Sequence, residues 1–219
     1  MAEAARIADE ALARVRHRLA ERPTEEEFAL ELDFEMRRQG ASGPSFDTIV
    51  ASGPNGAKPH HRPGDRRIRP GELVVLDFGA IVDGYCSDMT RTLCVGEPSS
   101  ETARRMVEVV AHSQRAGVAA VRAGAEAKAV DEACRSLIED AGWGDAFLHS
   151  TGHGVGLEIH EAPRVASTSS DTLATGQVVT VEPGVYLPDV GGVRIEDTLV
   201  VREDGCQVLT NAPKELVVG

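Results

Sequence analysis

The feature that most constrains the fold of this chain is a ten-residue segment that occurs twice. GELVVLDFGA at 71–80 aligns without gaps on GQVVTVEPGV at 176–185, so that Asp77 matches Glu182. Each segment reads as a buried strand, because aliphatic and β-branched residues dominate it. A carboxylate in such a strand is costly to bury unless positive charge lies beside it. The repeat therefore predicts two related halves, each holding an acid for a chemical reason.

A second acid follows each strand after a turn. DMT at 88–90 matches EDT at 196–198, with a connecting loop three residues longer in the second copy. In the first copy, the Asp-Gly dipeptide at 83–84 is a strong hairpin signal, because both central positions of a type I′ turn need positive φ. This turn places Asp88 diagonally from Asp77 on the same face of the hairpin.

The second hairpin is expected to keep the pairing of the first. Glu196 would then lie opposite Gly184, and Glu182 opposite Thr198. Four carboxylates would converge on the interior of a sheet, where two divalent ions could balance their charge. One isolated acid would more often be a salt-bridged or solvated strand residue, but four at matched positions favour a metal centre.

A neutral histidine could complete the coordination of these ions. Mixed oxygen and nitrogen ligands suit Mn²⁺, Co²⁺, Zn²⁺ or Fe²⁺ better than a thiolate-seeking metal. The stretch HSTGHGVGLEIHEAP at 149–163 holds three candidate histidines, namely His149, His153 and His160.

Helical patterns precede each pair of strands. Thr24 followed by Glu27 is a capping-box signature at the start of one helix. Four helices are expected, over 2–21, from 24 to about 38, from Ser99 or Ser100 to near 124, and one ending at Gly142. The expected fold class is α+β, with two helix–helix–hairpin halves related by a pseudo-twofold axis around a mainly antiparallel sheet. One domain over 1–219 would contain both halves.

The charge, hydropathy and cysteine content of the chain argue against nucleic-acid-binding and membrane-spanning proteins. The formal charge of −12 argues against a nucleic-acid partner, and the basic run HHRPGDRR at 60–67 is interpreted as a solvated loop. No apolar run reaches the roughly 18 residues of a membrane span, and no signal-peptide core is present. Four cysteines occur without a CxxC pair. A cytoplasmic protein with reduced thiols and no membrane partner is the simplest expectation.

Three stretches carry a resemblance to a known family. LDFGAIVDGYCSDMTRT, GHGVGLEIHEAP and VEPGVYLPDVGGVRIEDT resemble the pita-bread (creatinase/aminopeptidase) metallopeptidases, most of all the Xaa-Pro branch of prolidase and aminopeptidase P. The resemblance covers about 5 to 210. It implies a pita-bread fold and two divalent metal ions, Mn²⁺ or Co²⁺ in the first place and Zn²⁺ or Fe²⁺ as alternatives. The metal ligands it implies are Asp77, Asp88, His153, Glu182 and Glu196.

The resemblance also implies a mechanism. Asp88 and Glu196 match ligands that span both ions, and a hydroxide bridging these ions would attack the scissile carbonyl. Glu182 would carry a proton towards the leaving nitrogen. His60 and His160 match the two histidines that donate hydrogen bonds to the substrate.

Other side chains match positions around the site. His149 and Arg194 match positions that line or brace it, and Arg194 would orient a ligand carboxylate. Because His61 lies beside His60, the first substrate histidine is not assigned by sequence alone. Arg164, four residues past His160, could bind the carboxylate of a dipeptide, or it could be an ordinary surface arginine.

The expected substrates are small peptides with proline at the second position, either dipeptides or longer N-termini. The N-terminal domain that is usual in these relatives is expected to be absent, and a homodimer is an open option. Methionine aminopeptidase is an alternative, although its last ligand usually lies in a Q-x-E-H context where this chain has VRIED. A non-catalytic pita-bread binding module is a second alternative, but all five ligand positions here hold competent ligands.

Overall fold

The computed structural model describes residues 1–218 and contains four α-helices within them. They are α1 (Ala2–Val15), α2 (Glu25–Arg38), α3 (Glu101–Ala120) and α4 (Ala127–Asp140). Short 3₁₀ turns follow α1 at Arg16–Glu21 and occur at Gly53–Ala57 and Gly144–Ala146. The predicted capping box is present, because Thr24 and Glu27 each accept a hydrogen bond from the backbone amide of the other. The third helix ends four residues before Gly124, where it was expected to end.

The strands divide between the two halves of the chain. The first half holds β1 (Gly43–Pro44), β2 (Ile49–Ser52), β3 (Leu73–Phe78), β4 (Ala80–Val82), β5 (Tyr85–Cys86) and β6 (Met89–Val95). The second holds β7 (Gly152–Gly154), β8 (Glu161–Val165), β9 (Val178–Val181), β10 (Gly184–Leu187), β11 (Gly191–Arg194), β12 (Asp197–Arg202), β13 (Gly205–Val208) and β14 (Val217–Val218).

These strands form two larger sheets and two small ones. The larger sheets have the orders β14-β6-β3-β2 and β13-β12-β9-β7-β8, and the small ones are β1-β4-β5 and β10-β11. Within the described residues every strand pairing is antiparallel except that of β14 with β6. The predicted α+β class and mainly antiparallel pairing are therefore confirmed.

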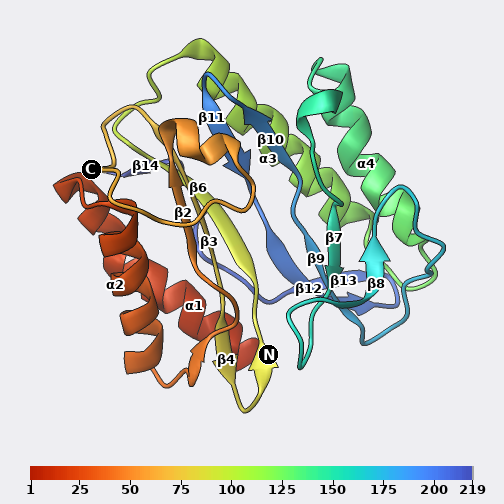
Figure 1. The fold of residues 1–219 in the computed structure, drawn as a ribbon. Coiled ribbons are helices and arrows are strands. Elements are labelled where there is room, and N and C mark those ends of the chain that lie inside the picture. The colour runs from red at the N-terminus through yellow and green to blue at the C-terminus, as the bar shows by residue number, and fades with distance from the viewer. Residues whose placement is uncertain (219) are drawn as a thin grey trace.

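Each half buries its own apolar core. In one core α1 and α2 pack on β2, β3 and β6, and in the other α3 and α4 pack on β9 and β12. Figure 1 shows the two helix pairs on opposite sides of the strands, α1 and α2 in red and orange and α3 and α4 in green. The strands that carry the repeated acids therefore lie between the two helix pairs.

The first hairpin has the predicted register. Asp83 and Gly84 both have positive φ, at 50° and 82°, as a type I′ turn requires. Val82 pairs with Tyr85, and further along the same register Asp77 pairs with Thr90. Asp77 and Asp88 consequently share one face.

The second hairpin departs from its predicted register by two residues. Gly184 pairs with Arg194 and not with Glu196, and Thr198 pairs with Thr180 and not with Glu182. The prediction assumed that the aligned acids of the two copies have equivalent strand partners. The second hairpin instead closes with Leu187 opposite Gly191, which sets a different register. A slip by an even number of residues keeps side chains on the same face, so the two acids still converge.

Gly184 pairs with Arg194, and Val181 pairs with Asp197. The same register between these two pairs places Glu182 directly opposite Glu196. The two acids of the second hairpin are therefore cross-strand neighbours, while those of the first are diagonal. No helix among residues 1–218 is long and apolar enough to span a membrane.

Candidate metal centre

The five predicted metal ligands all line one cavity of about 590 Å³ between the two halves. They come from different strands or from the residues beside them, and the geometry of the antiparallel pairings directs them to one place. Asp77 lies on β3, Asp88 just before β6, His153 on β7, Glu182 just after β9, and Glu196 between β11 and β12.

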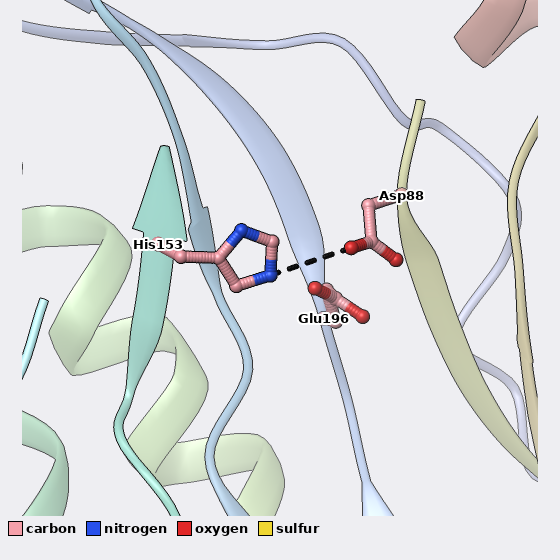
Figure 2. Close-up of side chains that lie close together, drawn as sticks. All are labelled: Asp88, His153 and Glu196. Atoms are coloured by element: carbon pink, nitrogen blue, oxygen red, sulfur yellow. Dashed lines mark ion pairs between the residues drawn. The ribbon is translucent and has the colours of Figure 1, made fainter. Parts of the chain in front are cut away.

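Three of these side chains are close enough to hold one ion. One ligand atom each from Asp88, His153 and Glu196 lies within 4.8 Å of the others, and Figure 2 shows the three side chains pointing at one another. The Nε2 atom of His153 lies 3.5 Å from Oδ2 of Asp88 and 3.4 Å from Oε1 of Glu182. A carboxylate-rich set with one imidazole is suited to a divalent ion such as Mn²⁺, Co²⁺ or Zn²⁺.

The tautomer of His153 suits metal binding. Its Nδ1 atom lies 2.9 Å from the backbone carbonyl of Gly154, to which an Nδ1–H group donates. This hydrogen bond leaves the lone pair of Nε2 directed at the acids, as is usual for a histidine ligand held by an outer carbonyl.

Two fully buried carboxylate oxygens at the cavity have no hydrogen-bond partner among residues 1–218. Oδ1 of Asp77 and Oε1 of Glu196 are buried and accept no hydrogen bond from the described residues. The other oxygen of each carboxylate is held, because Thr90 donates to Oε2 of Glu196 at 2.7 Å and Arg194 pairs with Oδ2 of Asp77. Unpaired buried carboxylate oxygens are costly, and a cation would satisfy both. The residues present thus fit a metal centre.

Electrostatics in the cavity lead to the same conclusion. Burial raises the pKa of Asp88 and of Glu182 well above their ordinary values, and the neighbouring charge of Glu196 raises both further. Burial, together with the charge of Asp77, raises the pKa of Glu196 to about 7. Like charges on one face oppose ionisation, so these acids would take up protons unless cations neutralise them.

Behind the acids lies a chain of hydrogen bonds that includes a residue missed by the sequence analysis. Arg194 donates to the hydroxyl of Tyr186 at 2.7 Å, and that hydroxyl lies 2.7 Å from Nε2 of His149. Nδ1 of His149 lies 2.8 Å from the carbonyl of Ser150. Tyr186 could have been identified because residues alternate along a strand, which places it on the face of Glu182.

Both ends of this chain are buried. Burial, together with the charge of Arg194, lowers the pKa of His149 to about 4, so His149 is neutral near pH 7. A neutral His149 with its proton on Nδ1 accepts the Tyr186 hydrogen bond at Nε2. Arg194 pairs with Asp77, and Nδ1 of His149 lies 3.9 Å from Oε2 of Glu182.

The predicted substrate histidines also line the cavity. The ring of His160 lies 4.2 Å from that of His153, centre to centre. His60 and His61 both line the cavity, but they differ in their contacts, because Nε2 of His61 is 2.8 Å from a carboxylate oxygen of Glu25. His60 is exposed to the cavity and makes no side-chain hydrogen bond among residues 1–218.

The basic run at 60–67 is only partly the solvated loop that the sequence suggested. Arg62 and Arg67 are exposed. Arg66, however, forms a two-point ion pair with Glu72, and His61 is mostly buried against Glu25. Two residues of this run, His61 and Arg66, therefore have an internal structural role.

Arg164 lies on β8, opposite His153 in the strand pairing, and lines the same cavity. Its side chain is exposed and makes no ion pair among the described residues. Cross-strand partners share a face, so the guanidinium can approach a ligand bound beside His153.

Solved structures define the class of this fold. The Xaa-Pro dipeptidase from Bacillus anthracis superposes with a TM-score of 0.97 at 47% identity, over 100% of this chain and 61% of that one. The X-Pro aminopeptidase from Thermotoga maritima MSB8 has a TM-score of 0.94 at 37% identity, over 100% of this chain and 62% of that one. The fold is therefore the pita-bread fold of such peptidases, as the sequence predicted.

Sequence comparison then gives the family. The model of Metallopeptidase family M24 matches residues 1–203. The Xaa-Pro dipeptidase of Pyrococcus furiosus is 45% identical over 215 residues, which is 98% of this chain and 62% of that protein. The chain belongs to metallopeptidase family M24. It spans about three-fifths of the length of the relatives it matches.

Proposed function

We propose that this chain is a metal-dependent peptidase that hydrolyses the Xaa-Pro bond of dipeptides or peptide N-termini with two divalent ions. The observation that carries the proposal is that ligand atoms of Asp88, His153 and Glu196 lie within 4.8 Å of one another. Beside them, one buried oxygen each of Asp77 and Glu196 has no hydrogen-bond partner among residues 1–218. Relatives named Xaa-Pro dipeptidase and X-Pro aminopeptidase support the substrate class.

Five side chains would hold the two ions, namely Asp77, Asp88, His153, Glu182 and Glu196. When bound, the ions would act as Lewis acids that activate water and polarise the substrate carbonyl. Arg194 would keep the carboxylate of Asp77 oriented through their ion pair. Mn²⁺ or Co²⁺ suits this oxygen-rich set.

The remaining roles belong to side chains that face the cavity. Glu182, across from Glu196, would take a proton from water and deliver it to the leaving nitrogen. His160 and His60 would donate hydrogen bonds to the substrate carbonyl oxygen as negative charge develops there. The apolar side chains of Phe46, Ile49 and Ile159 also line the cavity and offer contact for a pyrrolidine ring.

Arg164 favours dipeptides among these substrates. Its guanidinium makes no ion pair with any residue that the structure describes, and it lines the cavity opposite His153. A dipeptide ends in a carboxylate one residue beyond the scissile bond, which a free arginine can bind through two hydrogen bonds. Longer peptides would lack that charge at this point, and we expect them to be cleaved more slowly.

The test has two parts. Metal analysis of the purified chain should find two divalent ions per chain, with loss of peptidase activity on chelation and recovery on adding Mn²⁺ or Co²⁺. Then kcat/KM is compared for Ala-Pro, Ala-Pro-Ala and Met-Ala-Ser in the wild type and in Arg164→Ala. A preference for Ala-Pro that is lost in the variant would support the carboxylate role of Arg164.

Other outcomes would contradict parts of the proposal. Equal rates on Ala-Pro in both proteins would remove Arg164 from substrate binding. A clear preference for Met-Ala-Ser would indicate a methionine aminopeptidase. Absence of any bound metal above background would overturn the metallopeptidase mechanism and favour a binding module.

A further inference from the structure

A fully buried carboxylate lies outside the metal centre, at the start of α2. The side chain of Glu25 has no exposed surface. One of its oxygens accepts hydrogen bonds from the amide and hydroxyl of Ser52, at 2.8 and 2.7 Å. The side-chain amide nitrogen of Asn55 lies 3.2 Å from each of the two carboxylate oxygens. The second oxygen also lies 2.8 Å from Nε2 of His61. A charge buried this deeply is stable only when it is fully hydrogen-bonded.

The partners of Glu25 all belong to one segment, residues 52–61. Ser52 begins the segment, Asn55 lies in its 3₁₀ turn and His61 ends it. Between the last two tethers lies His60, whose side chain faces the cavity. On the other side of the segment, Arg194 donates to the carbonyl of Pro59 at 3.4 Å.

The second half of the molecule has a comparable arrangement. Asp131, fully buried on α4, accepts hydrogen bonds from the amide and hydroxyl of Thr151 at 3.2 and 2.8 Å. Arg135, paired with Asp131, donates to the carbonyl of His149 at 3.0 Å. In each half, a buried acid on the second helix therefore holds a segment that carries a site histidine.

We propose that Glu25 is a positioning residue for His60: by binding Ser52, Asn55 and His61 it fixes the segment that presents His60 to the substrate. The inference rests on the proposed function in one respect, that His60 contacts substrate. His61 serves as the last tether and not as a second substrate histidine, because its Nε2 atom is taken up by Glu25.

The ionised form of Glu25 is the one that can do this. Burial raises its pKa, but the hydrogen bonds from Ser52, His61 and Asn55 lower it below the ordinary value of 4.5. The carboxylate thus accepts from every tether at neutral pH. An amide at this position would turn one acceptor into a donor facing Asn55 and His61.

The experiment uses the full chain loaded with Mn²⁺ and Ala-Pro as substrate. Glu25→Gln and His61→Ala each remove tethers, and His61→Gln restores a donor that can reach Glu25. Glu26→Gln is the matched control, because Glu26 is exposed on the same helical turn and makes no side-chain hydrogen bond among residues 1–218. We expect kcat to fall about tenfold or more in Glu25→Gln and His61→Ala, with little change in KM or metal content. His61→Gln should recover most of the loss, and Glu26→Gln should match the wild type.

Two further readouts separate positioning from general destabilisation. In a His60→Ala background, His61→Ala should cause little further loss of kcat, because the tether acts through His60. Hydrogen exchange at the amides of Lys58 and His61, which both donate within the segment, should be faster in Glu25→Gln and His61→Ala than in the wild type. This measurement needs no catalysis, so it tests the tether even if the chain cleaves no Xaa-Pro bond.

Several outcomes would overturn the proposal. Additive losses in His60→Ala combined with His61→Ala would mean that His61 acts on the substrate directly. Unchanged exchange at Lys58 and His61 in His61→Ala would show that Glu25 does not hold the segment. If Glu25→Gln fails to fold, the comparison of His61→Ala with His61→Gln tests the proposal alone. A kcat for His61→Gln that stays as low as that of His61→Ala would contradict the tether.

Discussion

Among single residues, Glu182 has the position of a metal ligand and also faces a second acid. It faces Nε2 of His153 at 3.4 Å, as a ligand would, and it lies opposite Glu196. Burial raises its pKa well above the ordinary value. Bound cations would lower this pKa again, so that the ionised carboxylate could accept a proton from water and return it.

Glu182→Gln should therefore lower kcat by ~10²–10⁴-fold, because an amide accepts no proton and is a weaker ligand. The measurement is steady-state turnover of Ala-Pro at saturating Mn²⁺. Glu158→Gln, which removes an exposed acid of the neighbouring loop, should retain wild-type turnover. Comparable activity in Glu182→Gln and the wild type would reject a proton-transfer role for Glu182.

His160 and His153 are adjacent rings, yet we expect their substitution to have different effects. His153 is held by the Gly154 carbonyl and directed at the acids, whereas His160 makes no side-chain hydrogen bond among residues 1–218 and is free to bind substrate. His160→Ala should lower kcat by ~10²–10³-fold while both metal ions stay bound. Parallel metal analysis checks this, and loss of an ion from His160→Ala would show that the two roles are reversed.

The ionisation of Glu25 should make the free energy of unfolding depend on pH. Its pKa in the folded state lies below the ordinary value of 4.5. The unfolded chain therefore binds a proton at this residue at higher pH than the folded chain does, and acid favours unfolding. The stabilisation due to Glu25 is present above about pH 4.5 and is lost as the pH falls through the lower folded-state pKa.

The comparison is urea unfolding of the wild type and Glu25→Gln between pH 3 and 7. The wild type should be the more stable at pH 7, and the difference should shrink towards pH 3. A difference that stays constant over this range would mean that the ionisation of Glu25 does not contribute to stability.

At the scale of secondary-structure elements, the first hairpin depends on a glycine next to the acids. A Cβ atom at Gly79 would lie 1.8 Å from the carbonyl oxygen of Ser87 and 2.3 Å from Oγ of Ser45. Because backbone on the facing strand cannot move aside cheaply, no side chain fits there. Ser87 precedes Asp88, so a shift of this backbone would also displace a predicted ligand.

Gly79→Ala should lower the free energy of unfolding by about 2 kcal/mol or more and weaken Mn²⁺ binding. Gly64→Ala is the matched control, because nothing lies within 4 Å of a Cβ atom there. Chemical denaturation and metal titration of both variants check the prediction. If the two variants were equally stable, the close approach at Gly79 would have no energetic importance.

At the scale of the whole molecule, the two halves contribute ligands to one cavity. Asp77 and Asp88 lie on or beside β3 and β6, on which α1 and α2 pack. Glu182 and Glu196 lie beside β9 and β12, on which α3 and α4 pack, and His153 lies on β7, which pairs with β9. Without cations, the acids of both halves repel one another across the cavity. Bound ions should therefore hold the halves together as well as support catalysis.

Adding Mn²⁺ at 100 times its Kd should raise Tm by roughly 5–10 °C, because ions bind the folded chain and not the unfolded one. Thermal unfolding with and without chelator measures the shift. The double variant Asp88→Asn with Glu196→Gln serves as a control and should show almost no shift. A wild-type Tm that does not respond to Mn²⁺, Co²⁺ or Zn²⁺ would contradict a metal centre.

Much of this molecule can be derived from local pattern. The repeat, the Asp-Gly turn at 83–84 and the capping box at Thr24 predict the α+β class, the first hairpin and the start of α2, all of which the structure bears out. They succeed because each depends on residues close in sequence, where backbone preference and side-chain spacing decide the conformation. The shared face of Asp77 and Asp88 follows as well, since the Asp-Gly turn sets the register and alternation places residues two apart on one face.

Features that join segments distant in the sequence depend on the packing of the whole chain. The register of the second hairpin was set by the closing pair Leu187–Gly191, which matched acids cannot reveal. Glu25 and His61 lie 36 residues apart, and their contact depends on how α2 packs against the segment 52–61. Buried polar groups take whichever partners the packed interior brings to them. The pattern of neighbouring residues thus determined the elements and the face of each acid, whereas packing determined which histidine is tethered and which is free.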